Sequence, residues 1–145
     1  MVKTALEEFA FLIPLLPALA FAITFFFGRK MPSGGAIVPI LAIAASFVIS
    51  FAITLGLLAN PEEVISQSYS WFAVLNIGIL IDPLAAVMLS MVSFVSLLIH
   101  IYAVSYMSHD AGKARYFAET ALFTAAMLSL VLSDNILQLF VSWEL

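Results

Sequence analysis

The sequence predicts an all-α fold, a polytopic transmembrane helix bundle with four complete helices and half of a fifth. Of the 145 residues, 64% are hydrophobic and 10% are charged, whereas soluble domains have roughly a quarter charged residues. The apolar residues form long uncharged runs, and not the apolar stripe of a helix whose opposite face is exposed to solvent. These observations exclude an ordinary soluble protein. We therefore expect the lipid bilayer, and no nucleic acid, as a partner.

Two uncharged runs near the start of the chain predict the first two spans. Residues 9–27 match the roughly 20 helical residues that cross a hydrocarbon core. Residues 36–59 form the second run, in which Ala42, Ser46 and Ser50 recur at every fourth position. We expect this stripe of small side chains to let a neighbouring helix approach closely.

The next part of the chain, residues 64–81, is too interrupted for a spanning helix. It mixes serines with aromatic residues and contains Gly78, which favours a short irregular or hairpin segment with aromatic side chains at headgroup level. Asp82 then precedes Pro83, a typical N-cap followed by proline at the first helical position. The third span is predicted over residues 83–107.

Residues 116–133 predict the fourth span, and residues 135–145 predict the first half of a fifth helix. Either Asp134 or Asn135 can cap that helix, because both side chains accept hydrogen bonds from free backbone N–H groups. A helix of this length covers roughly 15 Å, about half of the hydrocarbon thickness. Its last carbonyls would be unsatisfied there. We expect residues 1–145 to be the N-terminal part of one longer membrane domain.

The basic residues predict the orientation of an integral protein of the plasma or inner membrane. Four of them lie in the connections at residues 28–35 and 108–115, and short cytoplasmic loops collect Lys and Arg. We expect both loops in the cytoplasm and the N-terminus outside. Lys3 is the one basic residue on the other side.

Glu144 is the main candidate for chemistry. It lies roughly 13 Å into the fifth helix, near the bilayer midplane, where an ionised side chain costs at least about 2.5–3.5 kcal/mol. Leu137, Phe140 and Val141 share its face, so we expect a buried site and a partner from another helix. The residue is a candidate proton carrier; the alternative is a carboxyl that fastens the helix by a hydrogen bond.

Two further polar positions are weaker candidates. Gln138 and Ser142 lie roughly opposite Glu144 and favour a hydrogen-bonding edge between helices. His100 lies about 26 Å along the third span from Pro83, near the cytoplasmic interface. It is either a proton relay at the cytoplasmic mouth or an ordinary interfacial histidine.

The remaining ionisable groups predict no metal or cofactor site in this chain. Arg115 and Glu119 have the i, i+4 spacing of a helical ion pair, and the alternative is a proton-entry role for Glu119. His100 and His109 are too far apart for a metal pair on one helix face, and cysteine is absent.

Five blocks of sequence resemble the antiporter-like L subunit of respiratory complex I and its relatives. The blocks are Ile81-Asp82-Pro83-Leu84; Leu98-Ile99-His100-Ile101-Tyr102 with Tyr106-Met107; Arg115-Tyr116-Phe117-Ala118 with Leu122-Phe123; Leu132-Ser133-Asp134-Asn135; and Trp143-Glu144. From about Ile81 onward, the order and spacing of these blocks match those of the family. Leu145 departs from it, since many bacterial L subunits have glycine there.

The resemblance implies a much longer subunit built of two inverted repeats that moves protons, driven by electron transfer elsewhere in the complex. It implies that Glu144 is the proton-carrying glutamate, paired with a lysine in a later helix. The subunit would be a non-redox part of a proton-pumping NADH- or F420H2-type dehydrogenase. Its partners would be other membrane subunits of the complex, and partner subunits would carry flavin and iron–sulfur clusters.

Two other functions remain open on the sequence. One is a Na⁺/H⁺ antiporter subunit of the Mrp type, which has the same fold, and the other is a structural membrane protein without transport. Among complex I relatives, the sequence as a whole most resembles an archaeal form, from a complex that oxidises reduced coenzyme F420 and reduces methanophenazine.

Overall fold

The computed structural model describes residues 9–60, 62, 64–72 and 75–145, and the side chains at 68–76 are outside this set. Lys3 and the aromatic side chains expected at headgroup level therefore lie outside the described residues. The elements are α2 (Leu12–Phe27), the 3₁₀ turns η1 (Gly28–Lys30) and η2 (Pro32–Gly35), α3 (Ile37–Ala59), β1 (Ile65–Phe72), β2 (Leu75–Ile81), α4 (Pro83–Tyr106), α5 (Lys113–Leu132) and α6 (Ile136–Glu144).

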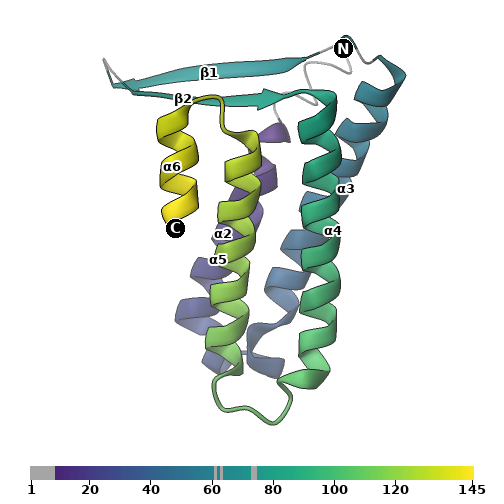
Figure 1. Ribbon diagram of the computed structural model, residues 1–145. Coiled ribbons are helices and arrows are strands. Elements are labelled where there is room, and N and C mark those ends of the chain that lie inside the picture. The colour runs from purple at the N-terminus through teal and green to yellow at the C-terminus, as the bar shows by residue number, and fades with distance from the viewer. Residues whose placement is uncertain (1–8, 61, 63, 73–74) are drawn as a thin grey trace.

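Helices α2, α3, α4 and α5 form an up-and-down bundle (Figure 1). In it α2 packs on α3 and α5, and α4 packs on the same two helices. The shorter α6 runs back along α5, and the strands lie across the end of the bundle from which α6 starts. Four helices are long and apolar enough to cross a membrane. The predicted bundle of four spans and a shorter fifth helix is confirmed, and the chain is an integral membrane protein.

The strands form the hairpin that the interrupted segment predicts. β1 and β2 pair antiparallel, with Ile65 opposite Ile81 and Gln67 opposite Ile79. Alternate residues of a strand point to opposite faces, and Ile79 and Ile81 turn toward the helices, where they are buried with Ile65 in the main apolar core. The hairpin is therefore packed onto the bundle and closes its end.

Most helix ends lie within a few residues of the prediction, but α5 begins at Lys113 and not at Tyr116. The prediction placed Lys113 and Arg115 in the connection because they are charged. Lys and Arg are good helix formers, so the helix extends through both and the connection is shorter than residues 108–115. The Lys113 side chain lies against Gly34, which places both basic connections at one end of the bundle.

Buried hydroxyls tie the spans together. The Ser46 hydroxyl of α3 donates to the Ile13 carbonyl of α2 at 2.8 Å, so the small-residue stripe is a packing surface as predicted. On the other side of α3, the Thr54 hydroxyl contacts the Ala86 carbonyl of α4 at 2.8 Å and the Ser90 hydroxyl at 2.7 Å. Such bonds satisfy polar groups that have no water in the hydrocarbon core.

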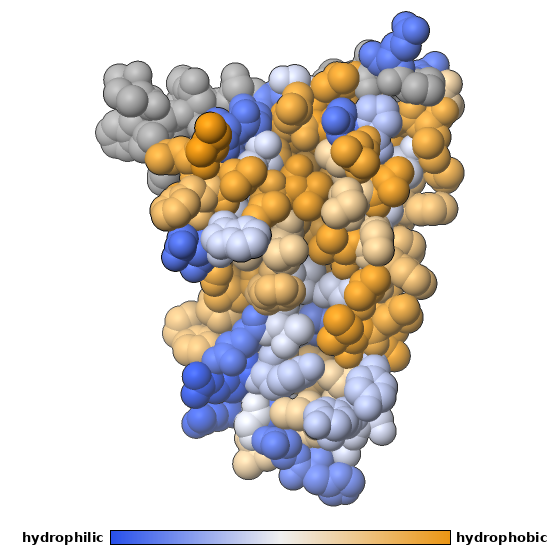
Figure 2. All heavy atoms as spheres, in the orientation of Figure 1, coloured by the Kyte–Doolittle hydropathy of each residue, from blue (hydrophilic) through white to orange (hydrophobic). Residues whose placement is uncertain are grey.

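The visible surface agrees with a membrane-embedded bundle. Figure 2 shows apolar side chains over much of the bundle, with hydrophilic ones at its lower end, around the connection between α4 and α5, and others at its upper end. Exposed large apolar side chains occur along each of α2, α3 and α4. A soluble protein of this size rarely exposes so much contiguous apolar surface, whereas lipid solvates it.

Candidate functional site

Glu144 ends α6, whose start is fixed by a side-chain cap. The Asn135 side-chain oxygen accepts a 2.8 Å hydrogen bond from the Gln138 N–H, which is the N-cap geometry. The prediction of Asp134 as a cap is wrong. Its carboxylate instead lies against Gly78 of the hairpin and accepts a 2.6 Å hydrogen bond from the Asn135 amide. From this cap, Glu144 lies roughly 13 Å along the helix axis.

The Glu144 side chain is exposed, and within the described residues it forms no hydrogen bond or ion pair. On the same face Leu137, Phe140 and Val141 are 52%, 59% and 53% exposed. The expectation of a buried face is therefore wrong for the described residues. Its physical reason is that α5, the helix against which α6 packs, lies on the other side.

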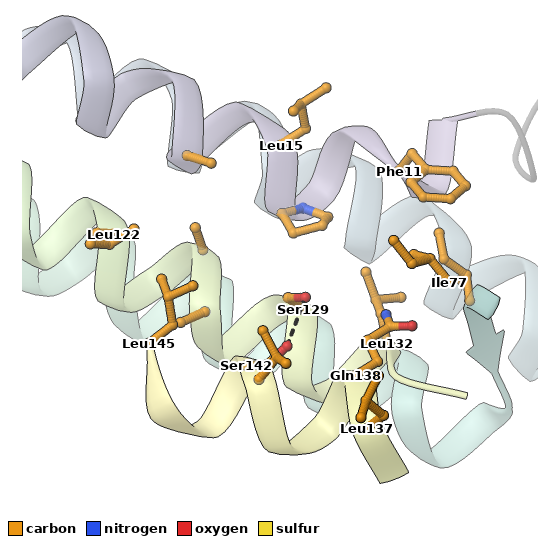
Figure 3. A pocket seen from close by; sticks show the side chains of 16 residues that line it. Phe11, Leu15, Ile77, Leu122, Ser129, Leu132, Leu137, Gln138, Ser142 and Leu145 are labelled. Carbon is orange, nitrogen blue, oxygen red and sulfur yellow. Dashed lines mark hydrogen bonds between the residues drawn. The ribbon is translucent and has the colours of Figure 1, made fainter. Parts of the chain in front are cut away.

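The opposite edge of α6 carries its hydrogen bonds. The Gln138 side-chain oxygen accepts from the Gly78 N–H of β2 at 3.1 Å, and the Ser142 hydroxyl donates to the Ser129 hydroxyl of α5 at 3.0 Å. Figure 3 shows Ser142 pointing at Ser129 across the space between the two helices. The predicted hydrogen-bonding edge at Gln138 and Ser142 is confirmed.

A groove of about 600 Å³ lies beside this edge, between α2, α5, α6 and the end of β2 (Figure 3). Its walls are almost entirely apolar, from Phe11, just before α2, and Leu15 of α2 to Leu132 of α5. The polar groups at its margin are those of Ser129, Gln138 and Ser142. Apolar walls without ionisable groups give no means of binding a metal or a charged cofactor.

His100 lies on α4 with its side chain inside the bundle. Its side chain is 0% exposed. The ring packs beside Phe117 of α5, with centroids 6.1 Å apart. Nδ1 lies 2.8 Å from the Ser96 carbonyl, while Nε2 is buried without a partner among the described residues. The prediction concerned only the depth of His100 along the span, whereas its burial depends on which side of α4 faces the neighbouring helices. Ser96 and Ala103, small residues on the same face, were the available signal.

Glu119 lies near the end of the bundle that carries the basic connections. Arg115 Nε donates to Glu119 Oε1 at 2.6 Å, and the two side chains are 77% and 55% exposed. The predicted i, i+4 ion pair is confirmed. Asp82 accepts a 2.6 Å hydrogen bond from the Ala85 N–H and starts α4 as its N-cap.

The structure does not bring the ionisable candidates together. Glu144, His100 and Glu119 lie on three different helices, and no hydrogen bond or ion pair among the described residues joins any two of them. Nor does any group of three or more His, Asp or Glu side chains in the described ranges have the geometry to hold a metal ion. The contact missed by sequence reasoning is Gly78 against Asp134 and Gln138, for which the only signal was a glycine inside a strand.

Comparisons with known proteins point to one family. Residues 71–117 match the family model described as NADH-ubiquinone oxidoreductase (complex I), chain 5 N-terminus. The chain is 39% identical to the chloroplast NAD(P)H-quinone oxidoreductase subunit 5 of Zygnema circumcarinatum, over 97% of this chain and 22% of that protein. It is 37% identical to NADH-ubiquinone oxidoreductase chain 5 of Arabidopsis thaliana, over 92% of this chain and 21% of that protein.

A shorter stretch is more similar still. Over 65 residues, 45% of this chain and 10% of the relative, it is 57% identical to the chloroplast subunit 5 of Chlorokybus atmophyticus. The chain spans about a fifth of the length of the curated relatives that it matches over nearly its whole length. These relatives come from chloroplasts and plants, so they give no support to the archaeal, F420-dependent form.

Proposed function

Since this chain belongs to the family of antiporter-like complex I subunits, we propose that it is part of a proton-translocating membrane subunit coupled to electron transfer in a NAD(P)H-quinone type of dehydrogenase. The carrying observation is Glu144, an acid at membrane depth on an uncovered face of α6. A carboxyl group there alternates between a neutral and an ionised form, and each change binds or releases one proton.

The ionised form needs a cation, and we propose a lysine from the remaining part of the subunit. The described lysines, Lys30 and Lys113, lie at the end of the bundle away from the start of α6. The uncovered face of Glu144 leaves room for another helix to bring an ammonium group within ion-pair distance. A carboxylate and an ammonium that move apart and together would exchange a proton in each cycle.

The chain itself supplies no redox chemistry in this proposal. It acts as a non-redox subunit, while partner subunits hold the flavin and the iron–sulfur clusters and oxidise the electron donor. Other membrane subunits of the assembly are its neighbours. We also propose that the connections containing residues 28–35 and 108–115 face the cytoplasmic side and that the N-terminus faces the opposite side.

The test is Glu144→Gln in the complete subunit, assembled in its complex and reconstituted in vesicles. Glutamine keeps the size of the side chain and removes the titratable proton. We expect intact assembly and electron transfer with at least a tenfold loss of proton translocation per electron, on the order of the effect of removing one proton-transfer group. Wild-type translocation by a correctly assembled variant rejects the carrier role.

Glu119→Gln is the matched control, because it neutralises an exposed carboxylate near the basic end of the bundle. It keeps full translocation unless Glu119 is the proton-entry group, the accessory role left open by the sequence. Repeating both measurements with and without Na⁺ separates the proposal from an Mrp-type Na⁺/H⁺ antiporter. Proton translocation that depends on Na⁺ and not on electron transfer supports the antiporter.

A further inference from the structure

Few apolar contacts fix the rotation of helix α6 about its own axis. Its large side chains Phe140 and Trp143 are 59% and 72% exposed, and Ile136 is 86% exposed. Apolar packing is not directional, so packing against α5 alone does not fix the direction in which Glu144 points. Hydrogen bonds are directional and can do so.

Two hydrogen bonds leave α6 on one edge, toward two different elements. Gln138 accepts from the Gly78 N–H of the hairpin at 3.1 Å, and Ser142 donates to Ser129 of α5 at 3.0 Å. The two residues are one turn apart, about 6 Å along the axis. Ser142 is 8% exposed. Two attachment points at different heights oppose a turn of the helix, because a rotation breaks both bonds and leaves their partly buried polar groups unpaired.

This edge determines where Glu144 points. At about 100° per residue, Glu144 lies roughly 140° around the helix from the mean direction of Gln138 and Ser142. With the edge held against β2 and α5, the carboxylate faces away from the bundle. We propose that Gln138 and Ser142 are positioning residues that together fix the rotation of α6, and through it the direction of the Glu144 carboxylate; this inference rests on the proposed function.

The hairpin lies beside the same hydrogen bond. A Cβ atom at Gly78 would overlap the Asp134 carboxylate, which is the exposed end of a flexible side chain and can turn aside. The pairing of Ile79 with Ser133 holds β2 next to the start of α6, so the Gly78 N–H stays within reach of the Gln138 side chain.

The experiment uses the complete complex in vesicles and measures protons translocated per electron as a function of pH. We expect Gln138→Leu and Ser142→Ala each to lower this ratio severalfold, about the factor by which one net hydrogen bond changes an equilibrium. We expect the double variant to lower it further and to displace the pH profile, because a reoriented carboxyl titrates in different surroundings.

Leu139→Ala, on a partly exposed position of α6, is the control for a general disturbance of the helix, and its pH profile stays that of the wild type. A Leu139→Ala profile displaced as far as that of the Gln138→Leu, Ser142→Ala double variant overturns the proposal.

Glu144→Gln in the same vesicles distinguishes this inference from the proposed function. Loss of translocation in Glu144→Gln with a wild-type ratio and profile in the Gln138→Leu, Ser142→Ala double variant overturns positioning alone. Normal translocation in Glu144→Gln overturns the proposed function itself. If the double variant fails to assemble, the single variants Gln138→Leu and Ser142→Ala decide by comparison with Leu139→Ala, since each leaves the other bond in place.

Discussion

The hydroxyl groups of Ser96 on α4 and Thr124 on α5 lie 2.5 Å apart in the interior of the bundle. Thr124 uses its own hydrogen for the Thr120 carbonyl, 2.9 Å away. Ser96 is therefore the donor, and Thr124 is its acceptor. Both side chains are buried, so this bond is a fixed polar link between two spans.

Thr124→Val keeps the shape of the side chain and leaves the Ser96 hydroxyl without an acceptor. We expect a loss of roughly 1–3 kcal/mol in the free energy of unfolding, the cost of an unpaired buried polar group. The measurement is reversible unfolding of the purified protein in detergent micelles, followed by helical circular dichroism.

The double variant Ser96→Ala, Thr124→Val is the control for this link. With both hydroxyls gone no polar group is left unpaired, so stability recovers part of the loss. A double variant as unstable as the sum of its single changes contradicts the assignment of Ser96 as donor.

The His100 ring offers a second stability test. Nδ1 bonds a carbonyl of its own helix, and Nε2 is buried without a partner among the described residues. We expect His100→Leu to change the free energy of unfolding by less than about 1 kcal/mol, because the loss of the Nδ1 hydrogen bond is offset by removal of the unsatisfied Nε2. His100→Ala leaves a cavity and costs more, about 2 kcal/mol or above. A loss of several kcal/mol in His100→Leu would mean that Nε2 has a partner in the complete protein.

The features predicted correctly from sequence are those that depend on neighbours along the chain. Uncharged runs gave the spans, and the Asp82-Pro83 pair gave the start of α4, since caps and helical periodicity are local. The spacing of Gln138 and Ser142 gave the hydrogen-bonding edge for the same reason.

The missed features depend on which elements meet across the bundle. Helix arithmetic gave the depth of His100 but not its burial, because burial depends on how α4 turns toward α5. The Gly78 contact with Asp134 joins segments far apart in the sequence, and no local rule identifies such a pair. The burial of Glu144 was overestimated, because an apolar face shared by residues of α6 does not show whether another element covers that face.

Two neighbouring polar residues at the start of α6, Asp134 and Asn135, have different roles. We expect Asn135→Ala to cost about 1 kcal/mol, because the Gln138 N–H loses its cap. Asn135→Asp keeps an accepting oxygen and restores most of this stability. Hydrogen exchange of the amides in the first turn of α6 measures the effect locally. Equal protection in Asn135→Ala and in the wild type contradicts the assigned cap.

Gly35 constrains the course of the basic connection between α2 and α3, in which Gly34 also has a positive φ. Gly35 has φ of 75°, and a Cβ atom there would lie 3.0 Å from the Gly28 Cα. A residue with a side chain is disfavoured at this position for two reasons: the left-handed region of φ favours glycine, and the added Cβ atom would make a close contact. We expect Gly35→Ala to lower the free energy of unfolding by at least 1 kcal/mol, roughly the cost of such strain. Gly112→Ala is the matched control, because Gly112 has an ordinary φ of −87° and its nearest neighbour is a movable Asp110 side chain. Equal stability losses in the two variants contradict a special role for the backbone at Gly35, whereas a loss confined to Gly35→Ala supports the close packing of the two connections at this end of the bundle.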